Sequence, residues 1–439
     1  MTHPRFRELL LLGGVAAVFA VGSLQVGGTA GIGLLAFIVV FGALHVAVRV
    51  LAPLADPILL PVAGLLVTMG LLQLASIDLA YNNVGAQWRS LAPLQAAWLA
   101  AGAAGFVATL YVFRAGLGAA WRIRYTLALL GIAALLAPLL PGIGHTVNGA
   151  RLWLRLGPLS FQPGEAAKVL LVLFLAAYLS ERRELLGLGT RRIGPLLFPD
   201  PRYVVPIIGL VGVAVLIFVR ENDFGSSLLF FMTFMAILWV ATGRLFYPVT
   251  GIGLFAVAVW FALRTFPHVT VRFDAWLHPY SDPQRSGFQV LQGQYALAEG
   301  GLSGMGLAGP DTQPNLIPVG WADFILVTIG HTLGLAGLLV VLMAFIVYLT
   351  RTFYIALRSR SDLHALAVTG FAIVTGVQAG VIAAGVTRVL PLTGVTLPFV
   401  SYGGSSLLAN FVILGCVMAV SNTERTTARP VHERTGVAA

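Results

Sequence analysis

The most regular feature of the chain is a series of apolar runs separated by short polar stretches. A helix needs about 20 consecutive apolar residues to cross a bilayer, and twelve runs approach that length. They cover about residues 9–26, 30–50, 58–77, 92–113, 125–140, 166–180, 203–219, 226–242, 246–264, 324–350, 364–387 and 405–421. The pattern predicts an all-α fold, a polytopic integral membrane protein with about twelve transmembrane helices.

One long polar segment, residues 266–322, interrupts this series and is rich in Gly, Pro, Gln and Asp. Connections of this length are usually functional or disordered. This one also carries apolar residues, such as Phe288 and Leu291, that allow it to fold against the membrane. We expect it to be a large extracytoplasmic loop that carries the activity.

Composition excludes several classes of protein. Hydrophobic residues make up 58% of the 439 positions and charged residues only 10%, whereas soluble domains carry about 25% charged residues. A soluble enzyme is therefore excluded. The single cysteine, Cys416, lies in an apolar run, which excludes a disulfide framework and a cysteine-ligated metal site.

The formal net charge of +10 raises the question of nucleic acid, but loop topology explains it better. With the N-terminus in the cytoplasm, 18 of the 27 basic residues fall in inside loops, as the positive-inside rule requires. We therefore expect no nucleic-acid partner, and both termini in the cytoplasm. Arg5 and Arg7 precede the first run without a clear cleavage site, which indicates a retained signal anchor.

Glu165 and Lys168 are the first candidate pair for chemistry. Pro163 suits the first turn of a helix, and a carboxylate two residues later complements the helix dipole. The two side chains are then three residues apart on one face. Lys168 is the only lysine in the chain, which favours a required point charge. A purely structural ion pair explains the spacing equally well.

A second polar group consists of Glu221, Asn222 and Asp223 between two apolar runs. Such groups are costly at membrane depth and tend to face a cavity or a partner. An interfacial turn in which Asp223 caps the next helix is the simpler interpretation.

Asp282 is the most distinctive carboxylate of the long loop. Pro283 restricts it to an extended conformation, and Arg272, Arg285 and Gln289 lie nearby in the sequence. A carboxylate beside cations on the outer side is typical of a site for an anionic substrate.

Residues 390–406 contain two prolines, three glycines and six hydroxyl side chains before the last apolar run. This composition favours a re-entrant segment that lines a wet cavity over a plain loop. Ser401 and Ser405 are its candidate substrate-binding residues.

Five blocks, together with their order and spacing, resemble the SEDS family of bacterial cell-wall proteins, which includes RodA, FtsW and SpoVE. The blocks are residues 148–168, 221–227, 272–307, 322–337 and 391–410, and the sequence LPFVSYGGSSL at 397–407 is the most specific match. The resemblance divides the single membrane domain of residues 1–439 into an additional N-terminal helix pair, 1–57, and a SEDS core, 58–439.

The resemblance implies a peptidoglycan glycosyltransferase that polymerises lipid II at the outer face of the cytoplasmic membrane, with a class B penicillin-binding protein as its partner. It makes Asp282 the catalytic residue. It also implies that Asp282 and Glu165 hold Mg²⁺ or Mn²⁺. The implied substrate-binding residues are Arg151, Glu165, Lys168, Arg272 and Gln289.

The chain departs from the family pattern at four positions. His331 and Thr332 stand where the family often has Glu, and Ile382 and Arg388 stand where Asn and Gly are usual. This form of the motif, together with the additional N-terminal helices, resembles the actinobacterial RodA branch. We therefore expect a role in cell elongation, with an FtsW-like role in division as the alternative.

Two other functions remain open at this point. A lipid II flippase also needs many spans, broken helices and a polar cavity, but it does not need a carboxylate in an outer loop. A non-enzymatic scaffold for a penicillin-binding protein needs neither a polar cavity nor a carboxylate in an outer loop.

Overall fold

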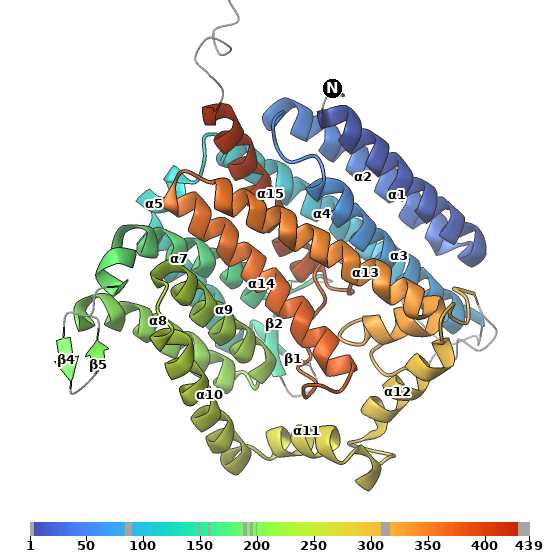
Figure 1. The fold of residues 1–439 in the computed structure, drawn as a ribbon. Helices are drawn as coiled ribbons and strands as arrows, with labels where there is room; N and C mark the ends of the chain where they lie inside the picture. The colour runs from blue at the N-terminus through green and yellow to red at the C-terminus, as the bar shows by residue number, and fades with distance from the viewer. Residues whose placement is uncertain are drawn as a thin grey trace, which may run out of the picture.

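The computed structural model describes residues 4–83, 90–147, 150–156, 159–187, 191–193, 196–198, 200–308 and 317–428 (Figure 1). Its long helices are α1 (Pro4–Val26), α2 (Thr29–Leu51), α3 (Leu59–Asn83), α4 (Leu91–Val112), α7 (Pro163–Gly187), α8 (Pro201–Arg220), α9 (Phe224–Thr242), α10 (Phe246–Thr265), α13 (Ile325–Arg358), α14 (Asp362–Val386) and α15 (Gly404–Ala428). Shorter helices are α5 (Gly118–Arg122), α6 (Arg124–Leu136), α11 (Pro267–Leu277) and α12 (Phe288–Gly300), with the 3-10 turns η1 (Ala137–Leu139) and η2 (Pro279–Ser281).

Eleven of the twelve predicted membrane helices are confirmed. Within the described residues, 11 helices are long and apolar enough to cross a bilayer. The remaining predicted run, 125–140, forms a shorter apolar helix at Arg124–Leu139. The chain is a multi-pass membrane protein.

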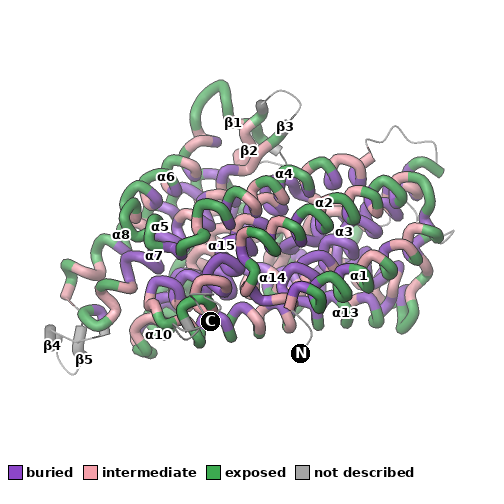
Figure 2. The backbone as a smooth tube through the Cα atoms, turned by 90° about the horizontal axis from the view of Figure 1, so that it is seen from above, coloured by how far each residue is buried: buried purple, intermediate pink, exposed green. Residues whose placement is uncertain are grey.

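The helices form a bundle with a buried centre and an apolar surface. Helices α3, α7, α14 and α15 are the most buried, whereas α1, α8 and α10 are the most exposed (Figure 2). The exposed positions of α10 include Ile252, Val257 and Trp260. Apolar side chains on the outside of a bundle suit a lipid environment and not water.

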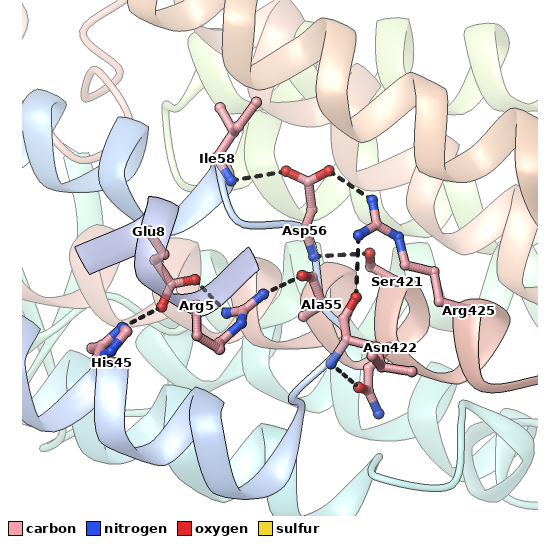
Figure 3. A network of polar contacts seen from close by, with 10 residues as sticks. Arg5, Glu8, His45, Ala55, Asp56, Ile58, Ser421, Asn422 and Arg425 are labelled. Carbon is pink, nitrogen blue, oxygen red and sulfur yellow. Dashed lines mark hydrogen bonds and ion pairs between the residues drawn. The ribbon is translucent and has the colours of Figure 1, made fainter. Parts of the chain in front are cut away.

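The start of the chain meets the end of α15 at one end of the bundle. Asp56, fully buried, bonds the guanidinium group of Arg425 on α15, while its backbone N–H donates to Ser421 Oγ at 3.1 Å (Figure 3). It also bonds the guanidinium group of Arg351 on α13. Arg5 bonds Glu8 and the carbonyl oxygen of Ala55. This network ties the additional helix pair to the core.

The long predicted loop is folded at the opposite end of the molecule from these contacts (Figure 1). Its described part contains α11, η2 and α12, and α12 packs on α13. Residues 309–316 of the loop, and Asn148 and Gly149 of the first family block, lie outside the described residues.

Two small antiparallel sheets were not predicted. One has the order β1 (Gly144–Val147), β2 (Ala150–Leu156), β3 (Leu159–Phe161), with Gly144 opposite Leu154 and Leu154 opposite Phe161. The other joins β4 (Arg191–Ile193) to β5 (Leu196–Phe198). The first sheet leads directly into α7 and so places the start of that helix.

The segment before α15, residues 390–403, has no regular secondary structure and lies largely buried in the bundle. Its backbone contacts two glycines. A Cβ at Gly70 of α3 would overlap with the carbonyl oxygen of Val400, and a Cβ at Gly225 of α9 would overlap with that of Thr393. The re-entrant character of the segment stays a prediction.

We expect Gly70→Ala to destabilise the protein, because the methyl group has no room beside the Val400 backbone. Overpacking of this kind costs about 1–3 kcal/mol. Gly42→Ala in α2 is the matched control, since no atom lies within 4 Å of its added Cβ and alanine favours the helix. Thermal unfolding in detergent measures both, and equal midpoints for the two variants would contradict this expectation.

Candidate active site

Asp282 lies at the end of η2, in the turn that leads into α12. Its Oδ2 accepts hydrogen bonds from Ser286 Oγ at 3.2 Å and from Ser286 N at 3.4 Å. Its carbonyl oxygen accepts from Gly287 N at 3.0 Å. A Cβ at Gly287 would overlap with the carbonyl oxygen of Pro279, so this turn requires glycine. Asp282 is half-buried, and both side-chain hydrogen bonds with Ser286 are made by Oδ2.

A cavity of about 120 Å³ lies beside this turn, between the outer loop and the end of α14. Of the predicted substrate residues, Arg272 from α11 and Gln289 from α12 line it together. Ser286, which bonds Asp282, lines it as well. The structure thus brings the Asp282 turn, one predicted cation and one predicted amide to a single cavity.

Asp323 and Arg388 also line this cavity, and neither was a predicted site residue. Burial raises the pKa of Asp323 to about 6, while Arg272 acts in the opposite direction. Its Oδ1 is buried without a hydrogen-bond partner. A sequence signal did exist, because Asp323 directly precedes an apolar run at the end of the active loop.

Glu165 and Lys168 form the predicted pair on the first turns of α7. Lys168 Nζ lies 2.7 Å from Glu165 Oε2, and both side chains are buried. Nζ also donates to Gln378 Oε1 of α14 at 2.9 Å. Gln378 Nε2 in turn donates to the carbonyl oxygen of Thr396 at 2.6 Å. The pair therefore connects α7, α14 and the buried segment before α15.

Asp223 caps α9 as predicted, because its side chain accepts from Ser226 N at 2.9 Å. Burial raises the pKa of this carboxyl, against the opposing effects of Ser226 and Arg272, and Glu165 raises it further. Asp223 thus interacts electrostatically with both Arg272 and Glu165. Glu165 belongs to the α7 ion pair, and Arg272 lines the cavity beside the Asp282 turn.

Glu221 is a buried carboxyl next to this group. Burial, followed by the charge of Asp223, raises its pKa from 4.5 to about 8. Its Oε1 is buried without a hydrogen-bond partner, while its backbone carbonyl accepts from Arg151 N at 3.2 Å. Burial therefore favours the protonated form of this side chain.

We expect the stability of the protein to fall as pH rises from about 4.5 to about 8, because folded Glu221 keeps a proton that the unfolded chain loses. Glu221→Gln has no such proton, so its unfolding midpoint should rise relative to wild type across this window. Thermal unfolding at pH 5, 6.5 and 8 measures the difference, with exposed Glu184→Gln as control. A constant difference at all three pH values would contradict the expectation.

The other three predicted substrate residues already have partners within the protein. Arg151 on β2 donates from Nη2 to the carbonyl oxygen of Leu140 at 3.0 Å. Ser401 Oγ donates to the carbonyl oxygen of Ala322 at 2.6 Å. Ser405 Oγ accepts from Gln162 N at 2.8 Å. Their substrate contacts stay predictions, and these bonds show that each also has a structural role.

The described residues do not form a preformed site for the predicted divalent cation. In the described ranges, no group of three or more His, Cys, Asp or Glu side chains could hold a metal ion. Glu165 is paired with an ammonium group, and Asp282 with Ser286. Magnesium keeps several waters and is commonly held by one or two carboxylates together with substrate phosphates, so a preformed cluster is not required. Mg²⁺ or Mn²⁺ binding stays a prediction, and no step below depends on it.

Comparisons with known proteins show the family of this chain. The family model for FtsW, RodA and SpoVE, described as a cell cycle protein, matches residues 57–426. "Peptidoglycan glycosyltransferase RodA" of Mycobacterium tuberculosis is 36% identical over 91% of this chain and 84% of its own length. The Mycobacterium leprae protein of the same name is 35% identical over 97% and 92%. "Stage V sporulation protein E" of Bacillus subtilis is 33% identical over 65% and 75%.

Solved structures share the fold. A chain from the structure described as "Structural coordination of polymerization and crosslinking by a peptidoglycan synthase complex" superposes with a TM-score of 0.60 and 25% identity, over 82% of this chain and 98% of that one. The crystal structure of the Thermus thermophilus rod shape determining protein RodA superposes with a TM-score of 0.57 and 24% identity, over 86% and 98%. The family model begins at residue 57, so α1 and α2 precede the region that it covers. The chain belongs to the FtsW, RodA and SpoVE family.

Proposed function

We propose that this protein is a peptidoglycan glycosyltransferase that polymerises lipid II, with Asp282 as its general base. The observation that carries the proposal is the shared cavity, to which the Asp282 turn, Arg272 and Gln289 all contribute. Family membership, and relatives named as peptidoglycan glycosyltransferases, support the reaction type.

The reaction joins two sugars and releases a lipid diphosphate. A hydroxyl oxygen of the acceptor sugar attacks the anomeric carbon of the donor, and the bond from that carbon to the diphosphate oxygen breaks. Asp282 takes the hydroxyl proton, a role worth about 10²- to 10⁴-fold in rate. Ser286 holds the carboxylate by its Oδ2, which leaves Oδ1 to receive the proton.

Charge stabilisation of the departing diphosphate falls to the cations of the site. Arg272 lines the cavity directly, and its guanidinium offsets negative charge as it develops on the leaving group. Gln289 supplies an amide that binds sugar hydroxyl or acetamido groups. The buried Lys168 is the second cation that we assign to the site: its ammonium group lies 2.7 Å from Glu165 Oε2, and Glu165 interacts electrostatically with Asp223.

The decisive experiment incubates the purified full-length protein with lipid II and resolves the products on a gel. Parallel samples contain Mg²⁺, Mn²⁺ or a chelator, which tests the predicted cation. Glycan strands support the enzyme. Lipid II movement across liposomes without polymer would favour the flippase, and neither activity would favour the scaffold.

The proposed function also implies a location and an orientation of the protein in the membrane. The protein lies in the cytoplasmic membrane with both termini in the cytoplasm and α11 and α12 on the outer side. Arg5 bonds the carbonyl oxygen of Ala55, and the adjacent Asp56 bonds Ser421 and Arg425, which supports a common side for the two termini. The bias of basic residues supports the cytoplasmic side. A cysteine-accessibility assay on intact cells tests this orientation.

The partner is a class B penicillin-binding protein that crosslinks the strands, and the role is in cell elongation. The structural relative from a peptidoglycan synthase complex supports such a partner, and the similarity to mycobacterial RodA proteins supports elongation over division. Co-purification from the native host tests the partner. Depletion tests the role, since rounded cells indicate elongation and filaments indicate division.

A further inference from the structure

Arg388 adopts a backbone conformation that arginine seldom takes. It lies two residues beyond the end of α14, with φ of +61°, in the left-handed region that favours glycine. The turn is fixed by hydrogen bonds from Val389 N and Leu390 N to the carbonyl oxygen of Ala384, at 2.7 and 3.0 Å. A residue kept in this region against its preference indicates that its side chain does something that glycine could not do.

The side chain of Arg388 crosses to α11, more than 100 residues earlier in the chain. Nε donates to the carbonyl oxygen of Trp276 at 2.8 Å, and Nη2 donates to that of Leu277 at 2.9 Å. In return, Trp276 Nε1 donates to the carbonyl oxygen of Arg388 at 3.0 Å. These three hydrogen bonds are called the Arg388–Trp276 contact below.

The contact suits the end of a helix. The last carbonyl groups of a helix have no partner within it and carry partial negative charge, and Trp276 and Leu277 are the last two residues of α11. A planar guanidinium can bond two neighbouring carbonyls at once, which an ammonium cannot do with the same geometry. Arg388 is therefore matched to this helix end in both charge and shape.

Helix α11 has few other attachments. In Figure 1 it lies at the edge of the bundle, between α10 and α12. Its first residues are held by ring contacts of Phe266 and His268 with Phe224, at 5.3 and 5.2 Å. Val271 and Leu277 are exposed, and of the described side chains of α11 only Val269 and Ala275 are buried. Arg388 thus secures the end of α11 that the ring contacts do not reach.

That end of α11 leads directly to the proposed catalytic residue. Four residues, 278–281, separate Leu277 from Asp282, and they form the compact turn in which Ser281 N donates to the carbonyl oxygen of His278 at 3.0 Å. Arg272 lies on α11 itself and lines the cavity together with Trp276 and Arg388. A displacement of the end of α11 would move both Asp282 and Arg272.

We propose that Arg388 is a positioning residue for glycosyl transfer: its contact with the end of α11 holds the Asp282 turn and Arg272 at the cavity. The proposal rests on the proposed function for its effect on rate, but the hold on α11 can be measured without any reaction. A displacement of about 1 Å in a catalytic group can lower turnover about 100-fold.

The test compares Arg388→Gln, Arg388→Lys and Trp276→Phe with wild type in two measurements on the full-length protein. Hydrogen–deuterium exchange reports on amides 274–282, and lipid II polymerisation reports kcat and KM. We expect Arg388→Gln to accelerate exchange in this segment at least about tenfold, and to lower kcat about 10- to 100-fold with little change in KM. Arg388→Lys should recover part of both, and Trp276→Phe should show a smaller effect.

The matched control is Arg264→Gln, which removes an exposed arginine near the end of α10 that lies over the ring of Trp260. It should leave exchange in 274–282 and kcat at wild-type values. Thermal unfolding identifies any variant that fails to fold. If Arg388→Gln does not fold, Trp276→Phe still tests the Arg388–Trp276 contact, because it keeps an aromatic ring and removes only the Nε1 hydrogen bond.

Two results would overturn the proposal. Wild-type exchange in Arg388→Gln would show that the contact does not hold α11. Faster exchange with unchanged kcat would show that the hold does not position the reacting groups. If wild type itself made no polymer, the proposed function would fail instead, and exchange alone would then decide whether Arg388 holds α11.

Discussion

Asp282→Asn should lower lipid II polymerisation about 10²- to 10⁴-fold, the usual contribution of a general base, while the protein folds as wild type. The amide cannot accept the hydroxyl proton. It can still accept the hydrogen bond from Ser286, since its carbonyl oxygen can replace the Oδ2 that makes this contact in the structure. The turn and the packing of Gly287 therefore remain intact, and the measurement is the amount of glycan on a gel against time.

Two further variants isolate the role of this carboxylate. Ser286→Ala keeps the carboxylate and removes only the hydroxyl donor at 3.2 Å, so its loss of activity should be smaller than that of Asp282→Asn. Glu184→Gln removes an exposed carboxylate near the end of α7, and this variant should polymerise lipid II at the wild-type rate. Polymerisation by Asp282→Asn at the wild-type rate would remove the proposed base, and with it the main argument for an enzyme over a flippase.

The membrane helices could be predicted from the sequence because one physical requirement dominates them. A chain in hydrocarbon must satisfy its own backbone groups, so each span needs an apolar run of about bilayer length. The predicted run 324–350 became the longer α13, Ile325–Arg358, which bends at Gly334 with φ of +64°. The extra length beyond the run carries polar residues, and hydropathy alone could not indicate it.

The strands were missed although the sequence contained a signal. Along β2 the larger polar and aromatic side chains alternate with leucines, and the alternating residues are Arg151, Leu152, Trp153, Leu154, Arg155 and Leu156. A period of two indicates a strand. The search for long apolar runs passed over it, because a strand of this length is much shorter than a membrane helix.

The sequence predicted which residues belong to the site better than it predicted the contacts between them. Arg272 and Gln289, which lie close to Asp282 in the sequence, line one cavity together with Ser286, the hydrogen-bond partner of Asp282. Contacts between distant segments, such as Lys168 with Gln378 or Arg388 with Trp276, depend on helix packing that no local spacing reveals. His331 is similar: it replaces the usual carboxylate, yet its Nε2 lies 3.4 Å from Glu299 Oε2 of α12, so a carboxylate approaches this position from another helix.

Variants of the α7 ion pair distinguish the two interpretations of Glu165 and Lys168 that the sequence left open. Lys168→Met removes the ammonium that lies 2.7 Å from Glu165 and 2.9 Å from Gln378. The remaining carboxylate is buried without its counter-charge, and breaking a buried pair in this way costs about 3–5 kcal/mol. We expect a large fall in the unfolding midpoint in detergent and loss of polymerisation.

The double variant Lys168→Met with Glu165→Gln separates stability from function. It removes both charges, so most of the lost stability should return, because replacing a whole buried pair is often neutral and contacting residues are not additive. Polymerisation should stay absent if Lys168 supplies charge to the site. A double variant that regained both stability and polymerisation would show that the pair only supports the start of α7, and the positive charge at the site would then come from Arg272.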